Sequence, residues 1–452
     1  MKRYIRIATV FICVFLFFVL LPEGCGNSTR QTQEKIETAD QVDSGGAGTA
    51  ETAIADQEKT GSGSTDTGTA KNGTADQEKT EAGTTGSGTT EAGAAGTTEA
   101  GVSADTTNQV SVVMVGDMLL HTRVQESGLQ TDGTYNFDYL FKNITTDIKN
   151  ADISIVNEEA ILGGSELGLS GYPSFNGPFE VGDAIVKAGF DVVLHATNHA
   201  LDKGTEGILS CLNFWEKNYP DMGILGINDS QKMRDTIYVI EKNNIKIAIL
   251  NYTFSTNGIT IPKDMPYCVN MLDKDLIEKD IIKAKEQADF IIVCPHWGTE
   301  YSLEATKMQK DWSQFFADQG VNLVIGTHPH VIEPITWIEG SNGGKMLVYY
   351  SIGNFVNATS GTGPGTGNRM VGGMAQITIE KDGKDKVYIK DYGVTPLVTQ
   401  LEENGKITTY KLSEYSDQLG QENQILKQDP DFSYVYCKEL CKKVFGDLYT
   451  GD

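Results

Sequence analysis

The sequence is short of positive charge and of paired cysteines. Its 452 residues include 37 lysines and arginines against 61 aspartates and glutamates, a formal net charge of -24. Binding to nucleic-acid phosphates needs a basic face, so we expect no nucleic-acid partner. The seven cysteines are scattered without paired spacing, which predicts neither a disulfide framework nor a zinc ribbon.

Aromatic residues are absent from residues 27–108, which are rich in Gly, Thr, Ala, Ser and Glu. Two short stretches recur there: Ala55–Thr60 returns as Ala75–Thr80. Such a composition cannot bury enough apolar surface to offset the entropy lost on ordering. We therefore expect residues 26–108 to be a disordered linker that holds a folded domain away from a membrane.

A basic start and an apolar run, Ile7–Leu21, open the chain. Fifteen apolar residues suit the core of a signal peptide better than a full membrane span. Gly24-Cys25 resembles the end of a bacterial lipoprotein cleavage site, although Pro22 departs from that pattern. Residues 1–25 are thus a lipoprotein-type signal with Cys25 as lipid anchor, an uncleaved membrane anchor, or a signal peptide with an incidental cysteine. All three place the protein at the extracytoplasmic face of the cell membrane.

Histidine is scarce and confined: none precedes residue 121 and none follows residue 330. All six follow short apolar runs of strand type, among them Phe290–Val293 and Val321–Ile325. Histidines placed this way are typical of a metal or acid/base site. The six are His121, His195, His199, His296, His328 and His330.

Strands alternate with helices first, and hairpins come late. This order favours an α/β fold with helices outside a buried sheet or pair of sheets. The expected strands are Val110–Val115, Ala151–Val156, Phe190–Leu194, Phe290–Val293, Leu323–Ile325 and Met346–Ser351, with paired strands Tyr238–Ile240/Lys246–Asn251 and Gly372–Ile379/Lys386–Tyr392. The expected helices are Val181–Ala188, Gly204–Glu216, Lys274–Ala288, Glu304–Gln319 and Tyr434–Val444, and Gly361–Gly373 is expected to be a mobile loop.

Polar side chains follow several of these strands: Asp117, Glu159, Asn198, His199, His296, His328 and His330. Ligands in such folds bind beyond the carboxyl ends of the strands, so we expect these residues to converge. Mixed oxygen and nitrogen donors suit Mn, Fe or Zn. A carboxylate can bridge two metals, and an amide ligand beside an imidazole leaves the imidazole free to protonate a leaving group. Bland alternatives are a turn residue for Asp117, a helix cap for Asn198-His199 and a structural role for His296.

Six motifs in order resemble the CapA family of poly-γ-glutamate capsule proteins, in the calcineurin-like metallophosphoesterase superfamily. The resemblance covers about Val110–Val398 and implies a metallophosphoesterase-like β-sandwich of two mixed sheets flanked by helices, a four-layer αββα arrangement. The motifs are Gly116-Asp117, Asn157-Glu158-Glu159, Ala196-Thr197-Asn198-His199-Ala200-Leu201-Asp202, His296-Trp297-Gly298-Thr299-Glu300-Tyr301, His328-Pro329-His330-Val331 and Tyr350-Ser351-Ile352-Gly353-Asn354-Phe355.

The resemblance also implies roles. Asp117 and His330 would bind a first metal; Asn198, His296 and His328 a second; Glu159 would bridge both; His199 would be the general acid. Leu119 stands where phosphoesterases usually have a histidine, and His121 is a possible substitute. We expect Glu300 and Tyr301 to bind substrate or support their loop, Asn354 to shape the site, His195 to be structural, and Glu158 to be a solvated neighbour.

Two functions remain open. The first is an exported, membrane-tethered, metal-dependent hydrolase with two divalent ions, taking part in synthesis of poly-γ-glutamate or another surface polymer. The second is a non-catalytic assembly factor that binds the anionic polymer or a subunit of its synthase. The expected domains are residues 1–25 (signal or anchor), 26–108 (linker), 109–400 (the folded domain) and 401–452 (a polar extension with a helix).

Overall fold

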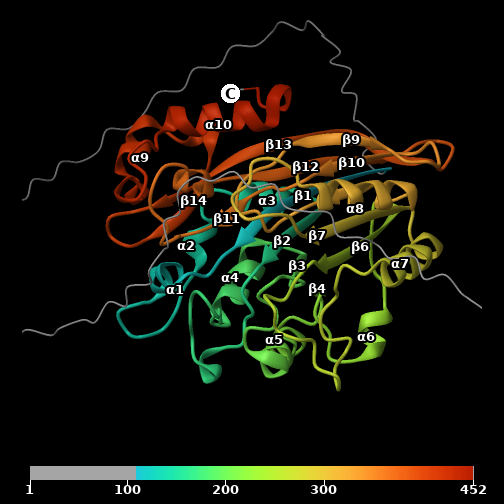
Figure 1. Cartoon of the computed structure of the whole chain (residues 1–452), viewed down its shortest axis with the longest axis horizontal. Coiled ribbons are helices and arrows are strands. Elements are labelled where there is room, and N and C mark those ends of the chain that lie inside the picture. The colour runs from blue at the N-terminus through green and yellow to red at the C-terminus, as the bar shows by residue number, and fades with distance from the viewer. Residues whose placement is uncertain (1–107, 451–452) are drawn as a thin grey trace, which may run out of the picture. The chain divides into compact units, whose positions relative to one another are not determined.

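A computed structural model describes residues 108–450 of the chain. Two mixed β-sheets form its centre, with helices around them (Figure 1). The larger sheet has the order β14-β13-β12-β1-β2-β3-β4, with β11 also paired to β1, and the smaller sheet has the order β5-β6-β7-β8-β10-β9. The expected α/β sandwich of two mixed sheets flanked by helices is confirmed.

The larger sheet consists of β1 (Gln109–Met118), β2 (Ile153–Glu158), β3 (Val192–Leu194), β4 (Gly223–Leu225), β11 (Asn354–Val356), β12 (Val371–Lys381), β13 (Val387–Leu401) and β14 (Ile407–Lys411). The smaller sheet consists of β5 (Tyr238–Lys242), β6 (Ile245–Thr253), β7 (Phe290–His296), β8 (Leu323–Ile325), β9 (Ile335–Glu339) and β10 (Lys345–Tyr349). The helices are α1 (Thr122–Gly128), α2 (Asp138–Phe141), α3 (Thr145–Asn150), α4 (Glu180–Ala188), α5 (Gly204–Asn218), α6 (Gln231–Asp235), α7 (Lys274–Gln287), α8 (Lys307–Asp318), α9 (Asp417–Glu422) and α10 (Tyr434–Phe445).

Strand β7 shows why the sheets pack in layers. Its side chains alternate between two faces, as in any strand. Phe290 and Cys294 join the core between the sheets, and the Cys294 sulfur lies 3.9 Å from that of Met114 in β1. Ile291 and Val293 belong instead to a second cluster, formed with residues of α7 and α8. Both faces of the strand are apolar because both are covered.

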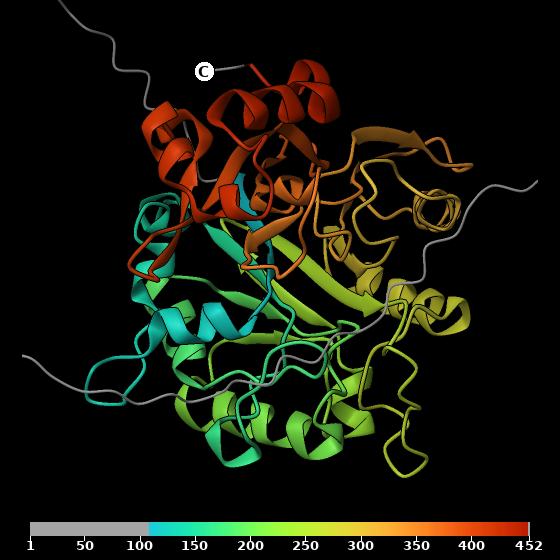
Figure 2. The ribbon, with the colours of Figure 1, turned by 60° about the vertical axis from the view of Figure 1, so that its left-hand side comes forward.

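The parallel strands place their carboxyl ends at common edges. Strands β1 to β4 are parallel neighbours, and so are β6, β7, β8 and β10. Helices such as α5 and α7 connect them outside the sheets (Figures 1 and 2). A residue that follows any of these strands is therefore delivered near the residues that follow its neighbours.

The glycine-rich stretch expected to be a mobile loop is partly regular. Residues Thr366–Met370 form a 3-10 helix, η3, and Val371 begins β12. Gly372 lies in this strand because a Cβ there would come within 1.9 Å of the Asn354 carbonyl oxygen. Further along, β14 extends the larger sheet through β13, and α9 and α10 lie near this end of it in both views (Figures 1 and 2).

Helix α8 begins at Lys307, three residues later than expected, because Thr306 and Gln309 form a capping box. The same Gln309 amide donates a hydrogen bond of 2.5 Å to Glu333, which has no exposed surface. Glu333 follows the loop that carries two of the six histidines. Burial raises the pKa of Glu333 to about 8, against the smaller opposing effect of the Gln309 hydrogen bond.

The raised pKa of Glu333 predicts a loss of stability with rising pH. The unfolded carboxyl loses its proton near pH 4.5 and the folded one near pH 8, so between these values the folded state binds more protons. Glu333→Gln keeps the hydrogen-bond acceptor without the charge. We expect the variant to gain about 2 kcal/mol over the native chain between pH 5 and pH 9 in urea unfolding. An unchanging difference would contradict this, and the exposed Glu339→Gln serves as control.

Candidate metal centre

The polar residues expected to converge meet at the carboxyl ends of strands from both sheets. No more than 6% of the surface of any of them is exposed. They are Asp117 in β1, Glu159 directly after β2, Asn198 and His199 after β3, His296 at the end of β7, and His328 and His330 after β8. Residues more than 200 positions apart in sequence thus share one buried site.

Asp117 is held from three sides. Its Oδ1 accepts a hydrogen bond of 2.8 Å from the Asn157 amide, and its Oδ2 accepts one of 3.1 Å from the backbone N–H of His328. The His330 Nδ1 lies 3.3 Å from the same Oδ2. The carboxylate is therefore fixed relative to the histidine loop, and its position does not depend on a mobile side chain.

Two imidazoles and an amide oxygen meet beside it. The Nε2 of His296 lies 2.8 Å from the Asn198 Oδ1 and 3.2 Å from the His328 Nδ1. Its other ring nitrogen, Nδ1, lies 3.0 Å from the Thr327 hydroxyl. Thr327 orients the ring so that Nε2 faces the other donors. A ring held by a hydrogen bond through its far nitrogen is common among metal ligands.

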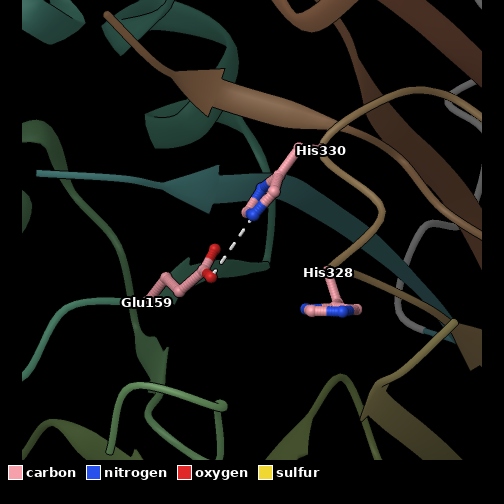
Figure 3. A group of neighbouring side chains, drawn as sticks. All are labelled: Glu159, His328 and His330. Atoms are coloured by element: carbon pink, nitrogen blue, oxygen red, sulfur yellow. Dashed lines mark ion pairs between the residues drawn. The ribbon is translucent and has the colours of Figure 1, made fainter. Parts of the chain in front are cut away.

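Glu159 lies between the two groups. Its Oε1 is 3.6 Å from the Nε2 of His296 and 3.6 Å from the Nε2 of His330. Neither carboxylate oxygen has a hydrogen-bond partner among the described residues, although both are buried. Donor atoms of Glu159, His328 and His330 lie within 4.8 Å of one another, and Figure 3 shows the three side chains pointing toward one another. Unpaired buried oxygens among imidazole nitrogens fit a divalent cation.

The loop after β8 adopts an uncommon backbone conformation. His328 and His330 have φ angles of 98° and 59°, in a region that residues other than glycine rarely occupy. Gly326 precedes them, and a Cβ there would lie 2.1 Å from the Tyr350 carbonyl oxygen. Strained backbone persists where its surroundings enforce it, and such positions gather at functional sites. Here the strain places both rings on the same side of the loop.

Charges couple the residues of the site. Burial lowers the pKa of His330, but the charges of Glu159 and Asp117 outweigh it and raise this pKa to about 9. Burial, with His296 and His330 close by, lowers the pKa of His328 well below its usual value. Burial and the charge of Glu159 raise the pKa of Asp117. A cation that binds here would displace a proton from His330, so its affinity should rise with pH.

His199 lies apart from the carboxylates and has its own partner. Its Nδ1 is 2.6 Å from Oδ2 of Asp202, an oxygen that also accepts a 2.6 Å hydrogen bond from the Phe175 N–H. The edge of the Phe175 ring contacts the imidazole, with 4.6 Å between ring centroids. The Asn257 side chain links this histidine to the metal centre, because its Oδ1 accepts a hydrogen bond of 3.3 Å from Asn198.

Four further residues named from the sequence surround the site. Asn354 holds both ends of His330: its Oδ1 is 3.1 Å from Nδ1, and its amide donates to the backbone oxygen at 3.0 Å. Tyr301 is 45% exposed, with its ring 6.1 Å from that of His330. Glu300 is exposed beside it. The ring of His121 packs on Phe175, and its nitrogens bond to no described residue.

The expectation that Glu158 is solvated is wrong. The residue has no exposed surface, and burial raises its pKa well above the usual value. Side chains alternate along β2, so Glu158 points away from the centre, toward α5, where it acts on Cys211. His195 lies on this side too: its Nε2 accepts a hydrogen bond of 3.3 Å from Trp215. A structural role suits it.

The sequence reasoning named no role for Asn157, Thr327, Asn257 or Arg369, which all contact site residues. Strand alternation could have identified Asn157, because it lies two residues from Glu159 on the same strand face. Thr327 precedes His328 and could have been tested as a partner. Asn257 and Arg369 come from irregular segments far along the chain, where no periodicity indicates their direction.

The fold and the site together define a class: a two-sheet α/β protein with a buried centre of carboxylate, amide and imidazole groups at its strand ends. The chain belongs to the family described as bacterial capsule synthesis protein PGA_cap, whose model matches residues 111–359. The family expected from the motifs is thereby confirmed.

Two curated relatives carry related names. The capsule biosynthesis protein CapA of Bacillus anthracis is 26% identical over 257 residues, which are 55% of this chain and 60% of that protein. The PGA biosynthesis protein CapA of Bacillus subtilis (strain 168) is 33% identical over 168 residues, 37% of this chain and 42% of that protein. The matches therefore span less than two thirds of either relative.

Two solved structures show a weaker likeness. An NAD nucleotidase of Haemophilus influenzae has a TM-score of 0.41 at 13% identity, covering 71% of this chain and 62% of its own. A purple acid phosphatase from yellow lupin seeds has a TM-score of 0.27 at 11% identity, covering 63% and 53%. At these scores neither likeness informs the chemistry of the site.

Two adjacent glutamates offer a matched test of the metal centre. We expect Glu159→Gln to lose bound metal, because an amide cannot supply two anionic oxygens to the centre. Glu158→Gln should keep the metal, because that carboxyl is buried on the opposite face of β2. Elemental analysis of the purified full-length chain, after growth with Mn, Fe and Zn, measures both. Equal metal content in the two variants would contradict the assignment.

Proposed function

We propose that the protein is a metal-dependent hydrolase of phosphoester type that takes part in synthesis of poly-γ-glutamate or another surface polymer. The observation that carries this proposal is the pair of unpaired Glu159 oxygens, buried among three imidazoles, a second carboxylate and an amide oxygen. A purely structural site would satisfy such oxygens with hydrogen-bond donors. The family membership supports the link to capsule synthesis.

The donor set fits two divalent ions. Asp117 and His330 would hold one, Asn198 and His296 with His328 the other, and Glu159 would contact both. Mn, Fe or Zn suits these donors, and no thiolate is among them. When bound, such ions supply Lewis acidity and lower the pKa of coordinated water, which favours attack on a phosphoester.

His199 is the residue we assign to proton transfer. Asp202 accepts the proton of Nδ1, which fixes the ring and leaves Nε2 to exchange a proton with a substrate oxygen. Phe175 packs against the ring and limits its rotation. Asp202 also stabilises the protonated form, so the histidine can donate a proton to a leaving oxygen.

A non-catalytic assembly factor is the second candidate. Leu119, two residues after Asp117, is 94% buried and offers no ligand atom, and His121 forms no hydrogen bond to the centre within residues 108–450. Asp117 and His330 therefore form the poorer half of the donor set. A protein with only one filled position would bind the polymer or a synthase subunit without efficient hydrolysis.

A substitution of His199 separates the two candidates. For the hydrolase, we expect His199→Ala to lower turnover of an aryl phosphodiester by about 100-fold to 10,000-fold, with unchanged metal content. Asp202→Asn should lower turnover less. Turnover of the chromogenic ester and surface polymer in cells that carry each variant are both measured. Full polymer production by His199→Ala would favour the assembly factor.

We propose that the N-terminus holds the protein at the outer face of the cell membrane. The basic start, the apolar run Ile7–Leu21 and Cys25 all lie outside the described residues. Within residues 108–450, no helix is long and apolar enough to cross a bilayer. A tether would therefore have to come from outside this part of the chain.

Cys25→Ser tests the form of the tether. If Cys25 carries lipid, the variant should lose incorporation of labelled fatty acid and shift from the membrane fraction to the medium or the soluble fraction. Cys211→Ser, at a buried cysteine of the folded domain, is the control for loss of a thiol. A variant that stays in the membrane fraction would instead support an uncleaved anchor at Ile7–Leu21.

A further inference from the structure

Arg369 is tied to the metal centre through its backbone. It lies in η3, just before β12, and its carbonyl oxygen accepts hydrogen bonds from the Asn354 amide at 2.9 Å and the Asn357 amide at 3.4 Å. Asn354 also holds both ends of His330. One amide side chain therefore sets the distance between the backbone of Arg369 and that of His330.

The side chain of Arg369 lies at the rim of the site. Its guanidinium stacks on the Tyr301 ring, with 3.5 Å between the guanidinium carbon and the ring centroid, and the same ring is 6.1 Å from that of His330. Nη1 donates a hydrogen bond of 2.8 Å to the Thr359 hydroxyl. Tyr301 itself has a φ of 66°, so its backbone adopts an uncommon conformation that presents the ring to the guanidinium.

This guanidinium has no counter-ion in the part of the chain that the structure describes. No carboxylate of residues 108–450 lies within ion-pair distance of it, and its Nε is buried without a hydrogen-bond acceptor. The contrast with Arg234 is direct, because that buried guanidinium meets both oxygens of Asp280 at 2.8 and 3.3 Å. A partly buried cation without an anion is costly, above all in so acidic a chain.

We propose that Arg369, with Tyr301 and Thr359, forms a subsite that binds an oxyanion group of the substrate beside the metal centre. Thr359 engages Nη1 and the Tyr301 ring supports one face of the guanidinium. The edge formed by Nε and Nη2 is left without a protein acceptor among residues 108–450, and this edge matches the two oxygens of a carboxylate or phosphate. The proposal rests on the proposed function, since it takes the buried centre as the place where substrate is bound.

The oxyanion has two possible sources in one substrate chemistry. It is the phosphate that reacts, or a carboxylate carried next to the reacting bond by an acidic polymer. Inorganic phosphate and a glutamate trimer represent these sources separately. Because neither probe needs to react, binding can be measured by calorimetry on the purified full-length chain, both with bound metal and after its removal by a chelator.

The test compares four chains. We expect Arg369→Gln to bind at least one probe ten or more times more weakly than the native chain. Arg369→Lys should lie between them, because lysine keeps the charge but loses the planar fork and the stacking. Arg123→Gln, at an exposed arginine, should match the native chain. Metal content and the midpoint of thermal unfolding should be the same in all four.

The outcomes are distinct from those of the hydrolase test. A weakened phosphate affinity assigns the subsite to the reacting group, and a weakened glutamate affinity assigns it to the polymer. Equal affinities in Arg369→Gln and the native chain would overturn the subsite, and so would the failure of both probes to bind the native chain. A native chain that binds no metal but keeps its Arg369-dependent affinity would overturn the hydrolase and leave the subsite standing.

Discussion

Two carboxylates buried side by side are the constraint on which the site depends. Asp117 and Glu159 have 0% and 1% exposed surface, and neither can be neutralised by water. Like charges brought this close raise the cost of ionising both, and the structure offsets that cost with imidazoles: the pKa of His330 is raised because it faces the two acids. A proton on His330 and a divalent cation are thus alternative solutions to the same electrostatic problem, which is why a metal is the natural occupant.

Such an arrangement needs a rigid support, and strand ends supply it. Asp117 belongs to β1 itself, and Glu159 is one residue beyond β2, so neither can relax away from the other without disturbing a sheet. The histidine loop is less regular, and its support comes from contacts instead: the backbone N–H of His328 donates to Asp117, and Asn354 holds His330 at both ends. Precise positions are thereby obtained from a strand for one ligand and from side-chain amides for another.

The sequence predicts what depends on periodicity and misses what depends on direction. The strand runs before His296 and before His328 were evident, and so was their convergence with Asp117, because parallel strands share an edge. Glu158 and Glu159 show the limit: both are acidic and adjacent, yet alternation along β2 sends one into the centre and the other into an apolar face. The strand was expected to end at Val156, so this alternation was not applied to them. Arg369 lies beyond a glycine-rich stretch, where no period predicts which way a side chain points.

The acidity of the whole chain weighs less against an anionic substrate than its net charge suggests. Charges on the surface are screened over about 8 Å at physiological ionic strength, so most of the excess acids do not reach the site. What a bound anion meets is local: the unpaired guanidinium of Arg369, the imidazoles, and the cations that we propose. Distant acids would instead slow the approach of a polyanion at low salt, an effect on association rate and not on the preference of the site. An acidic exterior and an anion-binding centre are therefore compatible in one protein, the first favouring release of a polyanionic chain and the second holding only the group that lies beside His330.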